Sequence, residues 1–324
     1  MQNELNKVRF SVKPLRSDNN KIVELARTVG VHPLAYQELP YDPEYSFYAG
    51  RLNPEVLSHA TADEMYWKVR QEVIFRHTGE HPYEISGPDA EKLLQKIFTR
   101  DISKVKVGRC SYQFACYNDG GMLTDGVLLK LEENKFWFVQ ADGDLFSWYK
   151  AHSDNLNVKI SDPDVWVSQI QGPKSMDLLK ILSKETFPEH WKYFDWKEIT
   201  ISNDKVIISR SGFSNELGWE IYFRKNNNIE KIGDQILEEG KKMGMILTGT
   251  PGFRCKRIES GLLSAGQDFN HETNPYDVGL GKYVDLKKNY FIGKSALMTA
   301  DKEKRCWGIR VENGTGLKGT YIKF

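Results

Sequence analysis

The most informative hydrophobic pattern in the chain spans residues 207–223 and predicts two strands joined by a tight turn. β-Branched residues run into Gly212, short polar residues fill the turn, and Gly218 opens a second run in which the side chains alternate. Because successive residues of a strand point to opposite faces of a sheet, this alternation sorts the second strand into two faces.

The two faces of that second strand differ in character. Trp219, Ile221 and Phe223 share one face, which we expect to lie in the core. Glu220 and Tyr222 share the other face. A carboxylate beside a tyrosine suits a flat heterocycle, because the carboxylate accepts ring N–H groups and the aromatic surface stacks on the ring. A solvated glutamate on an edge strand is the alternative, and the pattern alone leaves both open.

A second pattern is an internal repeat, in which residues 85–94 resemble residues 170–179. Each copy reads as a strand that ends at a glycine, followed by a proline that starts a helix with an apolar stripe. The offset of 85 residues between the copies is too long for a solenoid. We therefore predict two similar α+β halves.

Similar reasoning assigns the other elements. Residues 1–60 are rich in proline and tyrosine and predict a covering segment over a domain built by later residues. Thr61 and Glu64 form a capping box at the start of a helix. The predicted helices are 61–76, 144–153, 229–243, 255–264 and 291–297. The predicted strands are 111–117, 122–131, 135–141, 191–202, 205–211 and 306–312, with a hairpin turn at 118–121.

Composition narrows the class of protein. The chain has 324 residues, of which 40% are hydrophobic, and a formal net charge of +1. Such a balance of charges argues against binding to nucleic acid or to a membrane surface. No stretch approaches 18 apolar residues and the N-terminus has no signal-like core, so we expect a cytoplasmic protein.

The cysteines and histidines do not predict a metal site. His77 and His81 would share a helix face, but Gly79 and Pro82 disfavour a helix there. The four cysteines contain no Cys-x-x-Cys pair and are typical of reduced, buried thiols.

The stretch around the turn resembles a signature of the folate-dependent aminomethyltransferase, or glycine cleavage T-protein, family. It is most similar to the dimethylsulfoniopropionate demethylase branch of that family. The residues that match the branch are Arg210, Ser211, Gly212, Ser214, Gly218, Glu220 and Tyr222. Further blocks follow in the family's order, among them Gly87-Pro88, Asp119-Gly120-Gly121, Gln171-Gly172-Pro173, Arg257-Ile258-Glu259 and Phe291-Ile292-Gly293-Lys294.

The resemblance implies an α+β, T-protein-like fold that binds tetrahydrofolate. It places a folate-binding core subdomain at 1–64 and 165–300, with an inserted ferredoxin-like α+β subdomain at 65–164. Residues 301–324 would begin a truncated C-terminal β-barrel.

The resemblance also implies the site. The family has an aspartate pair after the Gly-Gly turn, and here Thr124 takes the first place and Asp125 the second. A hydroxyl cannot act as a carboxylate base at neutral pH, which favours methyl transfer over aminomethyl transfer with loss of ammonia. Methyl transfer needs chiefly correct positioning of the two reacting atoms. Thr124 and Asp125 are the expected catalytic residues.

Binding residues are assigned in the same way. Glu220 is expected to hold the pterin, with Tyr112 and Arg257 also near the cofactor. Tyr112 as a core aromatic residue, and Arg257 paired with Glu259 or Asp268, are alternatives that stay open.

Phe213 and Tyr222 are expected to face the cationic methyl donor. Phe213 replaces the branch's tryptophan, and Ala265 stands where both groups often have tyrosine. These two departures leave the identity of the donor open.

The predicted function is a tetrahydrofolate-dependent methyltransferase that demethylates a small sulfonium, ammonium or methylamine compound such as dimethylsulfoniopropionate. An aminomethyltransferase of glycine cleavage type and a non-catalytic folate-binding accessory protein are the alternatives. The expected partner is the small methylated substrate, and homodimer formation stays open.

Overall fold

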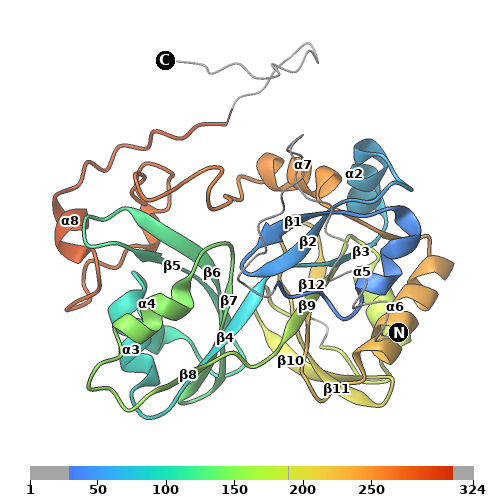
Figure 1. Ribbon diagram of the computed structural model, residues 1–324, viewed down its shortest axis with the longest axis horizontal. Coiled ribbons are helices and arrows are strands. Elements are labelled where there is room, and N and C mark those ends of the chain that lie inside the picture. The colour runs from blue at the N-terminus through green and yellow to red at the C-terminus, as the bar shows by residue number, and fades with distance from the viewer. Residues whose placement is uncertain (1–28, 189, 309–324) are drawn as a thin grey trace, which may run out of the picture.

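The computed structural model describes residues 29–188 and 190–308. Two mixed α+β halves pack against each other through their sheets, and helices cover the outer sides (Figure 1). The α+β class predicted from the sequence is confirmed. The expected barrel segment, 301–324, lies mostly outside the described residues, and residues 301–308 form no helix or strand. The strand predicted at 306–312 falls in the same region.

One half is built on a six-stranded sheet. Its strands, in spatial order, are β10 (Trp196–Ile201), β11 (Asp204–Ser209), β12 (Gly218–Phe223), β9 (Trp166–Gln171), β3 (Ile74–His77) and β13 (Ile246–Leu247). All neighbours are antiparallel except β13 and β3. Its outer face forms a core with α5 (Ser175–Leu182) and α6 (Ile229–Lys242).

The other half is built on an antiparallel five-stranded sheet. Its strands, in spatial order, are β5 (Cys110–Cys116), β6 (Met122–Glu132), β7 (Lys135–Gln140), β4 (His81–Ser86) and β8 (Lys159–Ser161). Its outer face is covered by α3 (Ala90–Ile97) and α4 (Leu145–Ala151). The hairpin turn predicted at 118–121 joins β5 to β6.

The remaining elements lie at the periphery. They are the hairpin β1 (Glu44–Tyr48) and β2 (Arg51–Val56), the helices α2 (Ala62–Gln71), α7 (Pro251–Glu259) and α8 (Lys294–Thr299), and the 3₁₀ turns η1 (Ala35–Gln37), η2 (Leu39–Tyr41), η3 (Ile102–Lys104) and η4 (Gly281–Tyr283). The segment after α7 crosses to the other half and ends in α8 beside β5 (Figure 1). No described helix is long and apolar enough to cross a membrane.

Several predicted boundaries are wrong, and α2 shows why. The capping box is present, with Thr61 and Glu64 hydrogen-bonded in both directions. The helix nevertheless stops at Gln71 instead of residue 76, because Ile74 and Phe75 enter the sheet as β3. Helix α7 starts at Pro251, before the predicted 255, where proline's missing N–H costs nothing.

The sequence repeat corresponds to β4–α3 and β9–α5. Gly87 and Gly172 join strand to helix with φ of +119° and +127°, a region that favours glycine. A Cβ on Gly87 would lie 2.8 Å from the carbonyl oxygen of Asn157, and one on Gly172 would lie 2.4 Å from that of Glu72. Both turns therefore need a glycine for the same two reasons.

The two sheets meet in a mixed layer. Val139 and Trp137 of one sheet pack against Tyr222, Ile207 and the strand β9 of the other. Strand β3 lies inside the range 65–164, yet it pairs with β9 and β13 of the six-stranded sheet. By strand pairing, the five-stranded unit begins at β4, and the full division into domains stays a prediction.

Candidate active site

A row of polar side chains crosses the inner face of the six-stranded sheet. Ser209 pairs with Glu220, Glu220 pairs with Gln169, and Gln169 pairs with Arg76. Paired residues of antiparallel strands point to the same face, so the four side chains form a continuous line across β11, β12, β9 and β3. All four are buried. Such a row inside a protein needs hydrogen-bond partners, and it is the natural candidate for a binding site.

Glu220 lies at the centre of this row. Its Oε2 accepts hydrogen bonds from the Ser211 hydroxyl at 2.6 Å and from the Tyr222 hydroxyl at 2.8 Å. Burial raises the pKa of the carboxyl, and the bonds from Ser211 and Tyr222 oppose that rise. Among the described residues, the other oxygen, Oε1, has only a long contact of 3.4 Å with Gln169 Nε2. Glu220 is therefore anchored on one oxygen and open to a donor on the other.

The turn before β12 holds Ser211 in place through Gln171. Gln171 Nε2 donates to the Ser211 carbonyl at 3.0 Å, and its Oε1 accepts from the Ser214 hydroxyl at 2.6 Å. The amide fills the space beside two glycines, since a Cβ on Gly212 would lie 2.1 Å and one on Gly218 2.3 Å from it. The glycines that flank the turn thus make room for the side chain that fixes it.

Gln169 supplies a second open acceptor. Its Nε2 points between two carboxylates, at 3.4 Å from Glu220 and 3.3 Å from Glu80. Its Oε1 is buried and has no hydrogen-bond partner among the described residues. Glu220 Oε1 and Gln169 Oε1 together form a pair of acceptors on neighbouring strands. This pair fits a flat ring that carries adjacent N–H donors, which is the donor pattern of a pterin.

Glu80 and Tyr48 extend the site beyond the row. Glu80 keeps some surface exposure but is closely surrounded by protein, and burial together with the charge of Glu220 raises its pKa to about 8. Burial raises the pKa of Tyr48, and the nearby charges of Glu80, Asp125 and Asp142 raise it further. Tyr48 therefore lies where the two sheets bring their acidic residues together.

The opposite sheet contributes Tyr112 and Asp125. The Tyr112 hydroxyl donates to Asp125 Oδ2 at 2.8 Å, and the Tyr112 ring lies edge-on to Tyr283 with centroids 5.6 Å apart. Burial raises the pKa of Asp125 to about 6, although the hydrogen bond from Tyr112 lowers it. Asp125 is thus mostly ionised at neutral pH, in the mixed layer between the two sheets.

Thr124 faces the other side of β6. Its hydroxyl donates to the Asp142 carbonyl oxygen at 2.5 Å, and its side chain is fully buried beside Gly143. The structure therefore separates the two predicted catalytic neighbours. Asp125 faces the mixed layer between the sheets, and Thr124 secures the loop after β7.

Two predicted binding residues have internal partners. Tyr222 is fully buried, with its hydroxyl on Glu220 and its ring 6.3 Å from that of Trp137. Arg257 is buried on α7, forms an ion pair with Asp268 and donates to Gln267 at 2.7 Å. The Asp268 pairing left open by the sequence is the one that the structure shows.

Phe213 lies at the edge of the site. It is half-buried and packs against a cluster formed by Val69, Ile74 and Phe253. The Phe253 ring in turn lies 5.1 Å from the guanidinium carbon of Arg76. Phe213 is thus on the Arg76 side of the polar row.

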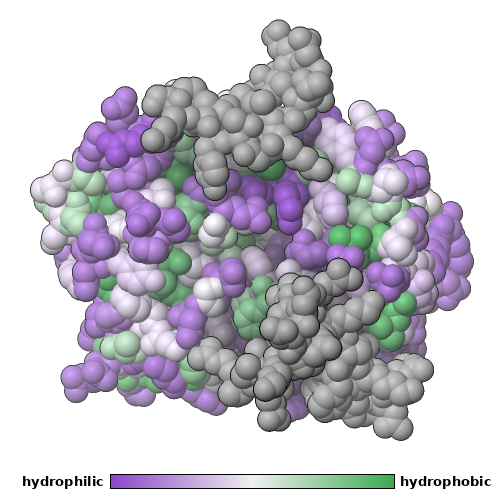
Figure 2. Space-filling view, turned by 45° about the horizontal axis from the view of Figure 1, so that its top comes forward, coloured by the Kyte–Doolittle hydropathy of each residue, from purple (hydrophilic) through white to green (hydrophobic). Residues whose placement is uncertain are grey.

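A cavity of about 650 Å³ opens beside Tyr112 and Tyr283. Its lining is rich in positive charge, with the basic residues Arg100, Lys104, Lys106, Arg109, Lys282 and Lys287. Arg100 also donates to the Tyr112 carbonyl oxygen at 2.8 Å, which links the cavity to the site. The face of the molecule in Figure 2 is hollowed near its centre, with hydrophilic residues at the rim of the hollow.

Sequence reasoning missed Gln169, Arg76, Glu80 and Tyr48. The signal for Gln169 was present in the repeat, because it precedes the second glycine by three residues on a strand expected to be buried. The register that places it beside Glu220 joins residues 51 positions apart. No local pattern contains that pairing.

Comparisons with known proteins identify the family of the chain. Residues 32–288 match the GCVT N-terminal domain. The dimethylsulfoniopropionate demethylase of Ruegeria pomeroyi is 32% identical over 268 residues, which are 82% of this chain and 72% of that protein. An aminomethyltransferase of Alkaliphilus oremlandii is 30% identical over 257 residues, covering 76% of this chain and 69% of the other. The trimethylamine-oxide aldolase of Ruegeria pomeroyi is 32% identical, but the match covers only 32% of that longer protein.

A solved structure supports the fold. The glycine cleavage system aminomethyltransferase T of Bartonella henselae superposes with a TM-score of 0.73 over 83% of this chain and 74% of that chain, at 19% identity. At this identity the likeness concerns the fold, and it confirms the predicted T-protein-like architecture. The family match covers most of the chain. The protein therefore belongs to the glycine cleavage T-protein family of tetrahydrofolate-dependent enzymes, on its demethylase-like branch.

Proposed function

We propose that the protein is a tetrahydrofolate-dependent methyltransferase that demethylates a small sulfonium, ammonium or methylamine compound. The observation that carries this proposal is the buried acceptor pair of Glu220 and Gln169 between the two sheets. Dimethylsulfoniopropionate is the donor named for a relative at 32% identity, and it is the first compound to test.

The residues for the cofactor are arranged along the inner layer. Glu220 and Gln169 would accept the N–H groups of the pterin, and Tyr112 would flank it. The basic cavity beside Tyr283 would take the glutamate carboxylates at the other end of the cofactor. When bound, tetrahydrofolate supplies N5 as the nucleophilic atom that accepts the methyl group.

The protein's own contribution is to position the donor and exclude water. With a sulfonium or ammonium donor the leaving group is a neutral thioether or amine, which needs no proton from a general acid. The N5–H proton of the cofactor would be released to water when the methyl group is transferred. Thr124, with its hydroxyl on the Asp142 carbonyl, is not needed as a base. Asp125, ionised at neutral pH, would favour a cation in the layer between the sheets.

The other predicted residues receive narrower roles. Tyr222 would position Glu220 through its hydroxyl, and its ring would not contact the donor. Phe213 would present its ring at the donor end of the site. Arg257 would fix the loop that follows α7 through Asp268.

An assay with a panel of donors tests the proposal. Purified protein is incubated with tetrahydrofolate and dimethylsulfoniopropionate, glycine betaine, dimethylglycine or sarcosine, and 5-methyltetrahydrofolate is measured by chromatography. We expect product with at least one onium donor and none without protein. Absence of product from every donor, with tetrahydrofolate bound in a separate titration, would contradict methyl transfer. A methylene product formed only with an aminomethylated lipoyl carrier protein would favour the aminomethyltransferase.

A further inference from the structure

Arg76 is a buried cation at one end of the polar row. Its side chain extends from β3 toward the layer between the sheets, and the residue is 7% exposed. Nη2 donates to Asn53 Oδ1 at 3.3 Å and to the Thr250 hydroxyl at 3.1 Å, both of them neutral acceptors. Nε has no hydrogen-bond partner among the described residues, and none of the described carboxylates forms an ion pair with this guanidinium.

The other two buried arginines have closer partners. Arg257 forms an ion pair with Asp268. Arg51 donates to the carbonyl oxygens of Glu80 and Val165 at 2.9 and 2.8 Å, and its guanidinium lies 3.9 Å from the ring centre of Trp166. Among the described residues, Arg76 forms no ion pair and donates to no backbone carbonyl oxygen, although its guanidinium carbon lies 5.1 Å from the ring centre of Phe253. Arg257 and Arg51 are buried as well, so burial alone does not explain why Arg76 lacks such partners.

An unpaired charge inside a protein is costly unless a ligand or a neighbour balances it. The nearby acids, Glu80, Glu55 and Glu38, act on Arg76 only at longer range, and burial lowers its pKa. Glu38 already accepts a hydrogen bond from Tyr45 at 2.6 Å. The Nε–H group of Arg76 thus has no partner among the described residues and can donate to an anion that enters the site.

The position of Arg76 matches the donor end of the proposed site. It is separated from Glu220 by one strand, β9, so the two side chains are rooted about 10 Å apart at the usual strand spacing. Tyr48 packs against Gly79, three residues after Arg76, and the charges of Arg76 and Asp125 both act on the pKa of its hydroxyl. A small molecule beside Arg76 would therefore also be close to the acidic residues of the opposite sheet.

We propose that Arg76 binds the carboxylate of the methyl donor and that the protein selects zwitterionic donors over simple onium cations. The carboxylate would accept from the Nε–H group of Arg76, and the methylated cation would face Asp125 and Glu80. This proposal rests on the proposed methyl transfer, because only that function identifies the ligand as a methyl donor. Binding of a carboxylate at Arg76 can be measured without turnover.

The first test uses matched ligands on the natural protein. Glycine betaine and choline share a trimethylammonium group, and only betaine has a carboxylate. The isostere 3,3-dimethylbutyrate keeps the carboxylate and replaces the cation by a neutral tert-butyl group. Calorimetric titrations in the presence of 5-formyltetrahydrofolate should show betaine and 3,3-dimethylbutyrate binding at least tenfold more tightly than choline. Equal binding of betaine and choline, or no binding of either carboxylate at millimolar concentration, would overturn the proposal.

The second test changes the arginine. Arg76→Gln should weaken binding of both carboxylates about ten- to a hundredfold, the range expected for a lost hydrogen bond to a charged group. Arg76→Lys should restore part of the loss. Arg254→Gln is the matched control, because Arg254 lies on α7 at the surface and pairs with Glu55 at 3.2 Å. We expect the control to bind all three ligands as the natural protein does.

The outcomes separate this proposal from the proposed function. Tetrahydrofolate affinity should be unchanged in a folded Arg76→Gln variant, because the pterin residues lie on other strands. Unaltered carboxylate binding in that variant would overturn the role of Arg76 and leave methyl transfer standing. A third outcome is that the natural protein binds carboxylates selectively, Arg76→Gln loses this binding, and no donor gives a methylated product. That outcome would support the anion site and contradict the demethylase.

Discussion

The units β4–α3 and β9–α5 have the same local structure and different tasks. Both end their strand at a glycine with positive φ, and both place an apolar helix stripe on the outer face of a sheet. Glu84 and Gln169 hold equivalent positions, three residues before Gly87 and Gly172. One of these two side chains belongs to the candidate active site and the other does not.

The difference comes from the neighbours that each strand acquires. Strand β9 lies inside its sheet, between β12 and β3, so Gln169 stands beside Glu220 and Arg76 and keeps an open acceptor. Strand β4 lies next to the short edge strand β8. Glu84 there accepts from the Trp137 indole at 3.1 Å and pairs with Lys135 at 3.4 Å.

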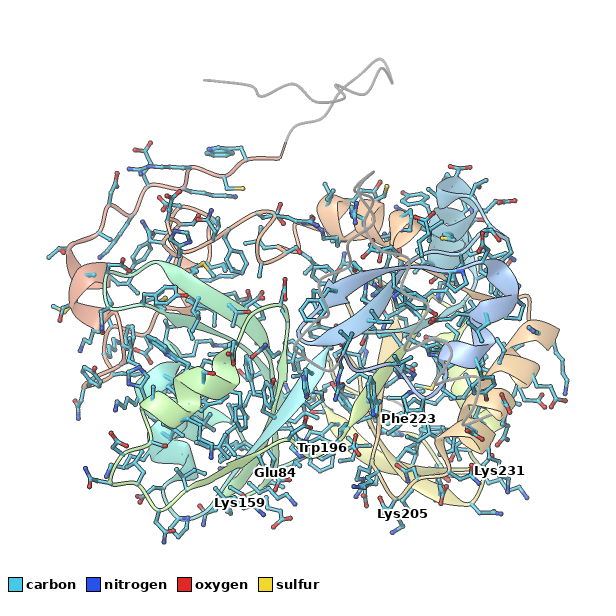
Figure 3. All side chains as sticks on the ribbon, in the orientation of Figure 1. Glu84, Lys159, Trp196, Lys205, Phe223 and Lys231 are labelled. Carbon is cyan, nitrogen blue, oxygen red and sulfur yellow. The ribbon has the colours of Figure 1, made fainter. Side chains whose placement is uncertain are left out.

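Figure 3 labels Glu84 on β4 and Phe223 at the end of β12, in the two different halves. Glu84 has charged and indole partners close to the surface, whereas the Gln169 amide has an unfilled acceptor in the interior. A repeated local sequence thus specifies a strand, a turn and a helix. The long-range strand pairing specifies which copy can bind a ligand.

The largest expected effect is on the turn that both copies share. Gly172→Ala should lower the free energy of unfolding by about 3 kcal/mol, because it combines a strained φ with a close backbone contact. Gly87→Ala should cost about 2 kcal/mol, since its closest contact is less severe. Denaturant unfolding measures both. If either substitution were neutral, the shared structural role of the two glycines would be contradicted.

The next effect should separate the copies. Gln169→Met should reduce tetrahydrofolate affinity about tenfold, corresponding to one lost hydrogen bond of about 1.4 kcal/mol. Glu84→Met, at the equivalent position, should leave that affinity unchanged. Isothermal titration of folded variants gives both values. Equal losses of tetrahydrofolate affinity in the two variants would show that the different neighbours of β9 and β4 do not determine which strand binds the cofactor.

An effect of similar size concerns the stability cost of burying Glu80 near Glu220. The folded state favours protonated Glu80, because its pKa is raised from 4.5 to about 8. Its contribution to stability is therefore present below about pH 4.5 and is lost as the pH rises through 8.

Glu80→Gln removes this titration. We expect the variant to gain about 1 to 2 kcal/mol relative to the natural protein between pH 5 and pH 8.5, a value discounted for partial exposure. Thermal or denaturant unfolding at the two pH values tests it, with Thr124→Val as a control that removes no titrating group. A pH-independent difference between Glu80→Gln and the natural protein would contradict the prediction.

The smallest expected effect is at Thr124. Thr124→Val removes the hydrogen bond to the Asp142 carbonyl and should cost about 1 kcal/mol of stability. Methyl transfer should continue, because no step needs the hydroxyl. Thr124→Ser, which keeps the hydroxyl, is the control. Loss of activity in folded Thr124→Val, restored in Thr124→Ser, would give this threonine a direct role.

The sequence predicted those features that depend on local chemistry. The period-two alternation correctly placed Trp219 in the core and Glu220 on the other face, and the Gly-Pro pairs correctly marked the strand–helix turns. The capping box located the start of α2 but not its end. The helix ends early because Ile74 and Phe75 pair with β9 in the six-stranded sheet.

Features that depend on long-range pairing were beyond a reading of local patterns. Tyr222 and Glu220 share a face, and only the fold shows that the tyrosine hydroxyl bonds to the glutamate. Arg76 looks like an ordinary residue in a short apolar run, and its unpaired state appears only when β2, β3 and α7 meet.

The most direct test of the central claim is a titration of tetrahydrofolate onto the natural protein, Glu220→Gln and Glu84→Gln under reducing conditions. Circular dichroism first establishes that all three are folded. We predict that Glu220→Gln loses at least tenfold in affinity, since its carboxylate faces the pterin, and that Glu84→Gln binds like the natural protein. Unchanged affinity in folded Glu220→Gln would contradict the assignment of Glu220 and Gln169 as the pterin acceptors.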